Sequence, residues 1–67
     1  MNGFEMETSK LAQVILQVQA SLPNVSALDI EDYCLADWPE GDEHQRWLNN
    51  ATVKEIADWV VEGLRNQ

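Results

Sequence analysis

The sequence predicts an all-α protein, a small bundle of three to four short helices in a single domain. Apolar residues recur at spacings of three and four along most of the chain, which is typical of amphipathic helices. Pro23 and the segment 38–41 interrupt this pattern and separate the helical segments. A chain of 67 residues is too short for a second core. Residues 1–7 show no periodicity, so a flexible tail is expected there and a helical domain over 8–67.

The first helix is expected over residues 8–22. Thr8 or Ser9 can cap its free backbone N–H groups. One apolar stripe follows, made of Leu11, Val14, Ile15, Val18 and Leu22. Leu16 lies about 140° from the start of that stripe at 100° per residue, which gives the helix a second, weaker apolar edge. Pro23 ends the helix, because the residue before a proline disfavours the α conformation.

The second helix is expected over residues 27–37, after a cap at Ser26. Its apolar stripe consists of Ile30, Tyr33, Cys34 and Trp38. Leu28 and Leu35 fall off this stripe, so a short irregular segment is the main alternative. The sequence Trp38-Pro39-Glu40-Gly41 then ends the element, through the restriction that proline places on Trp38 and a glycine able to adopt positive φ.

Two further helices are expected, over residues 42–49 and 52–65. Asp42 is predicted to cap the first of them, which carries Trp47 and Leu48. Thr52 and Glu55 form the S/T-x-x-E pattern of a capping box at the start of the last helix. The apolar stripe of that helix comprises Val53, Ile56, Ala57, Val60, Val61 and Leu64. The first and last helices, which have the longest stripes, are expected to form the main core.

The charge of the chain disfavours several classes of partner. Twelve acidic against four basic residues give a formal net charge of −8, which repels phosphate backbones and anionic lipid surfaces. No direct nucleic-acid binding and no membrane association are therefore expected. The apolar runs are far shorter than the roughly 20 residues that cross a bilayer. A single cysteine and the lack of a signal-peptide pattern indicate a cytoplasmic protein.

The residue inventory gives no basis for catalysis, a cofactor or a metal site. His44 is the one histidine and Cys34 the one cysteine, so neither has the partners of a zinc site. Neither residue lies in a recognisable nucleophile motif. A calcium loop ending its turn at Gly41 would require an acid at Ala36, and none is there. The sequence therefore predicts a protein that is not an enzyme.

Trp59 is the strongest candidate for a binding residue. It lies about 130° from the centre of the apolar stripe of the last helix and is expected to be partly exposed. Gly63 lies one turn after it and Glu55 one turn before, which predicts an aromatic ring beside a shallow gap. A core position for Trp59 is an equally weighted alternative. For Trp38 and Trp47, a core role is favoured.

An acidic segment over residues 29–43 is the second candidate surface. It contains seven acids and no lysine or arginine: Asp29, Glu31, Asp32, Asp37, Glu40, Asp42 and Glu43. A basic partner would bind here, although a solvated face that only aids solubility is the alternative. The predicted partner-binding residues are Trp59, Glu55, Glu62, Gly63, Asp37, Trp38, Glu40, Asp42 and Glu43.

These features favour a small acidic adaptor or regulator that binds another protein through a basic or aromatic-accepting surface. The alternative is an inhibitor whose carboxylates imitate nucleic-acid phosphates and occupy the basic groove of a DNA- or RNA-binding protein. A homodimer is a further alternative, because the stripe of the first helix together with Leu16 is wide for one small core. The tripeptide Ala-Asp-Trp occurs at 36–38 and again at 57–59. We interpret the repeat as a coincidence or as two helix ends of similar design, with a pair of surface aromatic residues as the alternative.

Overall fold

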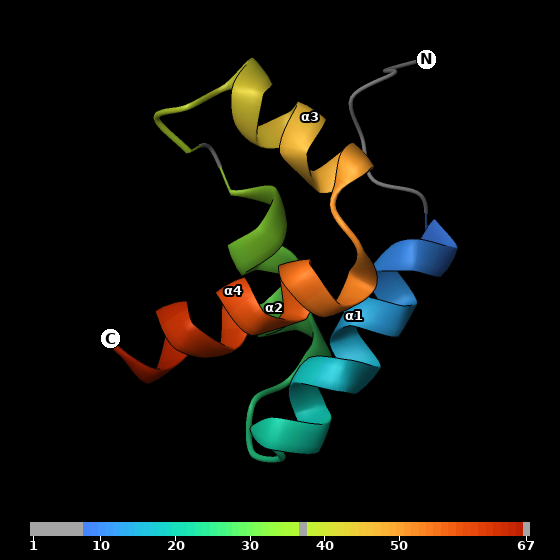
Figure 1. Cartoon of the computed structure of the whole chain (residues 1–67). Coiled ribbons are helices and arrows are strands. Elements are labelled where there is room, and N and C mark those ends of the chain that lie inside the picture. Colours follow the sequence, from blue (N-terminus) through green and yellow to red (C-terminus); the bar gives the residue numbers. More distant parts are fainter. Residues whose placement is uncertain (1–7, 37, 67) are drawn as a thin grey trace.

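Four helices make up the fold in a computed structural model, which describes residues 8–36 and 38–66. They are α1 (Thr8–Ser21), α2 (Ala27–Leu35), α3 (Asp42–Asn50) and α4 (Val53–Arg65). No strand occurs in these two ranges. Figure 1 shows α1, α2 and α4 packed together, with α3 at one end of the bundle. The prediction of a small all-α bundle is confirmed, whereas the predicted tail over 1–7 lies outside the described residues.

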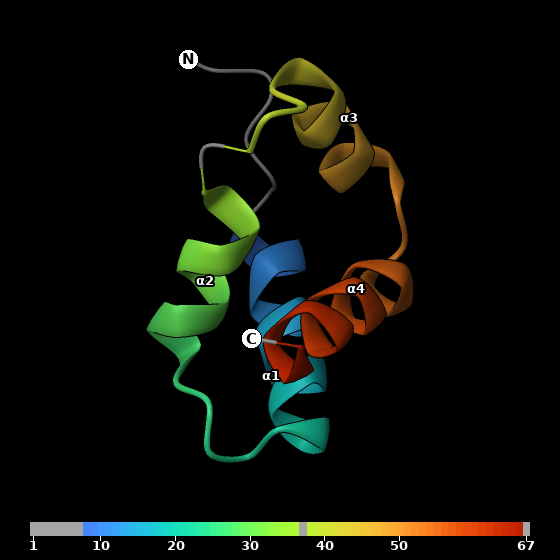
Figure 2. The same ribbon diagram turned by 90° about the vertical axis from the view of Figure 1, so that its left-hand side faces the viewer.

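The core lies mainly between α1 and α4, which share the largest helix–helix interface of the described chain, as predicted. Figure 2 shows α2 closing the bundle on the other side of α1. The buried apolar side chains come from all four helices and the α3–α4 link: Leu11, Val14, Val18, Ile30, Cys34, Leu48, Ala51, Ile56, Ala57 and Val60. Leu16 and Leu28 point away from this core and are 69% and 63% exposed, as their positions off the stripes predicted.

The start of α4 was predicted most closely. The backbone N–H of Glu55 donates to Thr52 Oγ1 at 3.1 Å. The backbone N–H of Thr52 donates to the Glu55 carboxylate at 2.9 Å, so the predicted capping box is confirmed. Ser26 caps α2 as predicted, because its hydroxyl accepts the N–H of Asp29 at 3.1 Å.

Two details of the predicted helix ends are wrong. Asp42 is not the cap of α3, because that position belongs to Gly41, and Asp42 is already the first helical residue. Gly41 has a φ of +57°, which glycine adopts without steric cost, so the chain turns into the helix one residue earlier than expected. Helix α2 is regular, which excludes the irregular alternative, but it ends at Leu35 rather than residue 37. Ala36 is extended, and Asp37 lies outside the described residues.

Side-chain donors satisfy the carbonyl groups at two helix ends. The indole N–H of Trp38 donates to the Tyr33 carbonyl at 2.9 Å, in the last turn of α2. The Lys10 ammonium of α1 donates to the carbonyls of Leu48 and Asn49, at 2.7 and 3.2 Å, in the last turn of α3. These bonds tie α3 to the bundle, whose tightest helix pairs all involve α1, α2 and α4.

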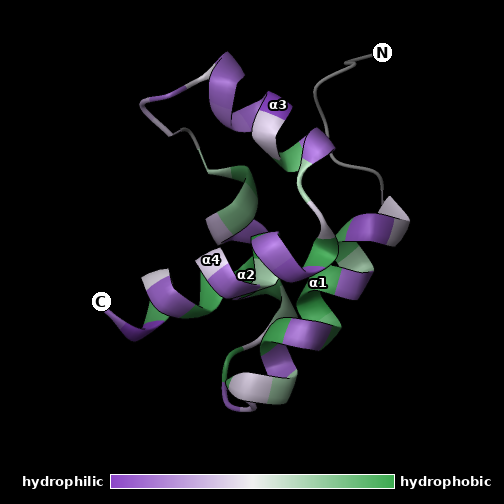
Figure 3. Cartoon of the chain, in the orientation of Figure 1, coloured by the Kyte–Doolittle hydropathy of each residue, from purple (hydrophilic) through white to green (hydrophobic). Residues whose placement is uncertain are grey.

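The distribution of hydropathy agrees with this arrangement. Figure 3 shows α3 as largely hydrophilic, with its hydrophobic part near the end that leads to α4. Leu48, in that part, is completely buried. Over the described residues, each of the four helices is too short or too polar to cross a bilayer.

Candidate functional site

Five aromatic rings gather where α2, α3, α4 and the link between α2 and α3 meet. They belong to Tyr33, Trp38, His44, Trp47 and Trp59, which we call the aromatic cluster. Trp59 contacts all four others, with ring centroids 4.9 Å from Tyr33, 5.2 Å from His44, 5.3 Å from Trp47 and 5.4 Å from Trp38. These distances lie in the favourable range for tilted and edge-to-face aromatic pairs. Trp59 is therefore the centre of the cluster.

His44 anchors α3 beneath the aromatic cluster. It is 8% exposed, and its Nε2 lies 2.9 Å from the carbonyl oxygen of Cys34. Because a carbonyl oxygen only accepts, Nε2 carries a proton and donates it. His44 was expected neither in the core nor at a helix contact, because it was considered only as a metal ligand or catalyst. Its spacing to Trp47 and Leu48, at i, i+3 and i+4, nevertheless indicates that all three lie on the buried side of one helix.

Trp38 is held in place on both sides of its backbone and through its ring. Its indole N–H is directed inward to the Tyr33 carbonyl, and its carbonyl accepts the Gly41 N–H at 2.9 Å. Its ring meets the Tyr33 ring edge-to-face at a centroid distance of 5.1 Å. Trp47 packs against the core, in line with the core role favoured for it, but it remains partly exposed, and so does Trp38. Three indoles are too bulky for the narrow space between helices this short, so part of each remains at the surface.

A hollow of about 270 Å³ opens over the exposed side of the cluster. We call it the aromatic groove, and it is lined by Trp38, Glu40, Glu43, His44, Trp47 and Trp59. The rings form most of its walls, while Glu40 contributes from the turn before α3 and Glu43 from the first turn of that helix. The side chain of Trp59 is partly exposed, as predicted.

A second hollow, of about 440 Å³, also borders Trp59. It is lined by Asp58, Trp59, Glu62 and Gly63, all from α4. The gap predicted beside Gly63 is narrower than expected, because the hydroxyl end of Tyr33 from α2 lies against this glycine. The predicted ring, Trp59, does lie beside a depression, but Tyr33 fills the side of that depression that faces α2.

The structure brings some of the predicted partner-binding residues together and separates others. Four of them line the aromatic groove, namely Trp38, Glu40, Glu43 and Trp59. Glu62 and Gly63 line the hollow behind Trp59. Asp42 lines a neighbouring depression, which shares Trp38 and His44 with the groove. Trp47 and His44 complete the groove and were not among the predicted binding residues.

Glu55 has a structural role, and Asp37 lies outside the described residues. The Glu55 carboxylate accepts the Thr52 backbone N–H, and this hydrogen bond, together with the one to the Thr52 side chain, lowers the pKa of Glu55. A carboxylate engaged in this way stabilises the first turn of α4. Glu55 is not part of the lining of either hollow beside Trp59.

The carboxylates of the aromatic groove have no cationic partner among residues 8–36 and 38–66. The ion pair in this part of the chain joins Lys54 and Asp58 at 2.8 Å, along the exposed side of α4. Glu40 and Glu43 therefore contribute uncompensated negative charge beside the indole rings. The overall net charge of −8 adds to this negative potential.

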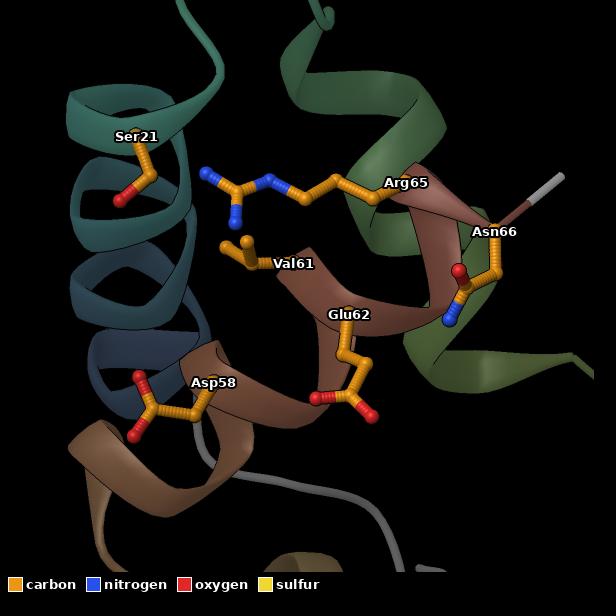
Figure 4. Close-up of a pocket in the computed structure, with 6 residues that line it drawn as sticks. All are labelled: Ser21, Asp58, Val61, Glu62, Arg65 and Asn66. Atoms are coloured by element: carbon orange, nitrogen blue, oxygen red, sulfur yellow. The ribbon is translucent and has the colours of Figure 1, made fainter.

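A larger depression than the aromatic groove, of about 620 Å³, lies elsewhere, between the end of α1 and α4 (Figure 4). Ser21, Asp58, Val61, Glu62, Arg65 and Asn66 line it. Figure 4 shows Arg65 extended toward α1, with Asp58 and Glu62 along the side of α4. The lining is mostly polar, open and of mixed charge, which is typical of a solvated surface.

The thiol of Cys34 is enclosed in the core. Cys34 is completely buried, and this burial raises the pKa of its thiol to about 11. A thiol of this kind is a poor nucleophile, because the thiolate is the reactive form. Within the described ranges, no three His, Cys, Asp or Glu side chains are grouped so as to hold a metal ion.

The fold and the groove define a small all-α bundle with a partly exposed aromatic surface. Comparison with protein-family models, with curated proteins and with solved structures gives no significant match for this chain.

Proposed function

We propose that this chain is a small acidic protein–protein interaction module, an adaptor or regulator without catalysis of its own, that binds its partner through the aromatic groove. The observation that carries this proposal is the arrangement of Trp38, Trp47 and Trp59 around one hollow, each partly exposed. Tryptophan is strongly enriched among the residues that dominate binding energy at protein interfaces. Large apolar rings at the surface of so small a domain indicate a contact surface.

The fixed geometry of the rings also supports binding. Trp38 is held by its hydrogen bond to Tyr33, and Trp59 is packed among four other rings. Rings that are already ordered lose little side-chain entropy when a partner arrives, so more of the contact energy contributes to affinity. The negative charge of the groove favours a partner with a positive surface and accelerates its association.

A native pull-down with three forms of the tagged chain tests the proposal. The forms are the natural chain, a Trp59→Phe variant and a Leu28→Ala control, which changes an exposed apolar residue of α2. Circular dichroism first establishes that each variant is folded. The proposal is supported if a partner stays bound at high salt and after nuclease treatment. The same partner should bind the control as well as the natural chain, and Trp59→Phe should weaken its binding. Equal retention by all three forms contradicts it.

The same experiment tests the alternative function, a nucleic-acid-mimicking inhibitor. A mimic binds through its carboxylates, so its partner elutes at moderate salt and competes with added DNA. That result, with no effect of Trp59→Phe, favours the mimic over the module. The net charge of −8 is the observation behind this alternative.

Two further properties belong to the proposal. We place the protein in the cytoplasm, where a reducing environment suits the free thiol of Cys34. Self-association is an alternative use of the exposed Leu16 edge of α1, which is 69% exposed. Size-exclusion chromatography over a dilution series tests it, because a dimer shifts to smaller size as concentration falls.

A further inference from the structure

We propose that the aromatic groove receives the guanidinium group of an arginine, presented by a basic segment of the partner protein. This inference rests on the proposed function and names the chemistry that the groove recognises. It follows from three properties of the groove: the identity of its walls, the charge of its rim and its size.

The walls suit a cation. The face of an indole ring carries negative potential, and tryptophan binds cations above its face better than tyrosine or phenylalanine does. Three indoles, from Trp38, Trp47 and Trp59, line the groove, with centroids 5.3 to 5.4 Å apart in the two pairs that include Trp59. Because these centroids are so close together, one cation placed against two of the rings can lie within about 6 Å of both centroids, the distance at which the attraction is significant.

The rim supplies matching charge. Glu40 and Glu43 line the groove together with the indoles, and within the described part of the chain neither is paired with a lysine or arginine. Glu43 stands in the first turn of α3 and Glu40 just before that helix, and the Glu43 backbone N–H donates to the Glu40 carbonyl at 3.2 Å, so the two acidic residues of the groove are close neighbours. A purely apolar ligand would leave these carboxylates partly desolvated without a partner, which is unfavourable. A cation compensates them.

The size of the groove fits one side chain. Its volume, about 270 Å³, lies below the range of roughly 300 to 1,000 Å³ that is usual for small-molecule sites. Arginine suits it better than lysine, because the guanidinium is planar and stacks on an indole face while its N–H groups pair with a carboxylate in a fork. The ammonium of lysine is a compact, strongly hydrated charge that makes no such stacked and forked contact.

A peptide titration followed by NMR tests this inference on the whole chain. The probe is a short glycine–serine peptide with a single central arginine, added to ¹⁵N-labelled protein. Matched peptides carry lysine or citrulline, which has nearly the shape of arginine without its charge. We expect the arginine peptide to shift the indole N–H resonances of Trp47 and Trp59. We expect citrulline to bind about tenfold more weakly, and lysine to fall between the two.

Two double variants locate the binding site without disturbing the core. The double variant Glu40→Gln and Glu43→Gln removes the negative charge of the groove and is expected to weaken binding of the arginine peptide about fivefold. Asp29→Asn with Asp32→Asn removes the same charge from the exposed side of α2 and is expected to leave the affinity within about twofold. Equal binding of arginine and citrulline, or equal effects of the two double variants, overturns the inference.

The outcome is separable from that of the pull-down. If a partner depends on Trp59 but the arginine peptide leaves the indole resonances unchanged, the module stands and the arginine specificity is wrong. If the arginine peptide binds in the groove but no partner depends on Trp59, the recognition chemistry stands and the adaptor role is wrong.

Discussion

The hydroxyl end of Tyr33 occupies the space in which a side chain at Gly63 would begin. A Cβ atom placed on Gly63 would overlap the Tyr33 hydroxyl oxygen and its ring carbon Cζ. Tyr33 is confined on other sides by the rings of Trp38 and Trp59. The contact between α2 and α4 therefore depends on a glycine inside a helix, where alanine is otherwise preferred by about 1 kcal/mol.

Replacing this glycine should destabilise the protein. Gly63→Ala forces Tyr33 away from its aromatic neighbours, and overpacking of this kind typically costs about 1 to 3 kcal/mol, which exceeds the gain in helix propensity. Urea unfolding followed by circular dichroism measures the change in the free energy of unfolding. In a Tyr33→Ala background the same substitution should become stabilising, by up to about 1 kcal/mol. A stabilising effect in the natural background contradicts the structural account.

The link between α1 and α3 gives a second prediction. Lys10→Met keeps the aliphatic length of the side chain but removes the hydrogen bonds to the carbonyls of Leu48 and Asn49. We expect a loss of about 1 kcal/mol in the free energy of unfolding. Lys54→Met is the matched control, because the ion pair between Lys54 and Asp58 is exposed on α4 and exposed pairs contribute little. Equal effects of the two substitutions would show that Lys10 does not hold α3.

The capping box of α4 predicts a dependence of stability on pH. The pKa of Glu55 is lowered in the folded state, first by the hydrogen bond from the Thr52 backbone and then by that from the Thr52 side chain. A lowered folded-state pKa means that the stabilisation is complete above the ordinary glutamate pKa and is lost as the pH falls through the folded value. The stability advantage of the natural chain over Glu55→Gln should therefore be larger at pH 7 than at pH 3. Urea midpoints at the two pH values check this, and an advantage that does not change with pH contradicts it.

The sequence predicted those parts of the fold in which local signals and burial agree. Helix α4 has a capping box at Thr52 and Glu55 and a continuous apolar stripe, and its start was predicted within one residue. Helix α2 ends at Leu35, two residues before the end expected from the Trp38-Pro39-Glu40-Gly41 signal. Trp38 and His44 then donate to the carbonyls of its last turn. These bonds join residues from different elements, and periodicity does not reveal them.

The groove was predicted only in part, for a related reason. Trp59 and Trp38 were both predicted as binding residues, although a core role was favoured for Trp38, whereas Trp47 was expected only in the core. The two tryptophans of the repeated Ala-Asp-Trp tripeptide contact each other at 5.4 Å between ring centroids. They lie in different local structures, Trp38 after the end of α2 and Trp59 within α4, so the repeat does not mark two similar helix ends. Their meeting depends on how α2 and α4 pack, which is a property of the whole fold.

The buried thiol of Cys34 gives the last prediction, a chemical measure of how often the core opens. Cys34 is completely buried, and its pKa of about 11 leaves about one thiolate in 1,000 at pH 8, against about one in ten for an exposed thiol. Labelling by a disulfide reagent should therefore be very slow in the native protein and should accelerate steeply in urea.

The position of His44 makes this measurement specific. Its ring donates to the Cys34 carbonyl, so His44→Ala leaves that buried carbonyl without its donor and weakens the attachment of α3. The variant should label faster in the absence of urea. Leu16→Ala, at an exposed position on α1, should label at the natural rate. Rapid labelling of the natural chain in native buffer would contradict the complete burial of Cys34 in the core. Equal labelling rates for His44→Ala and the natural chain would show that the hydrogen bond of His44 to the Cys34 carbonyl does not protect the thiol.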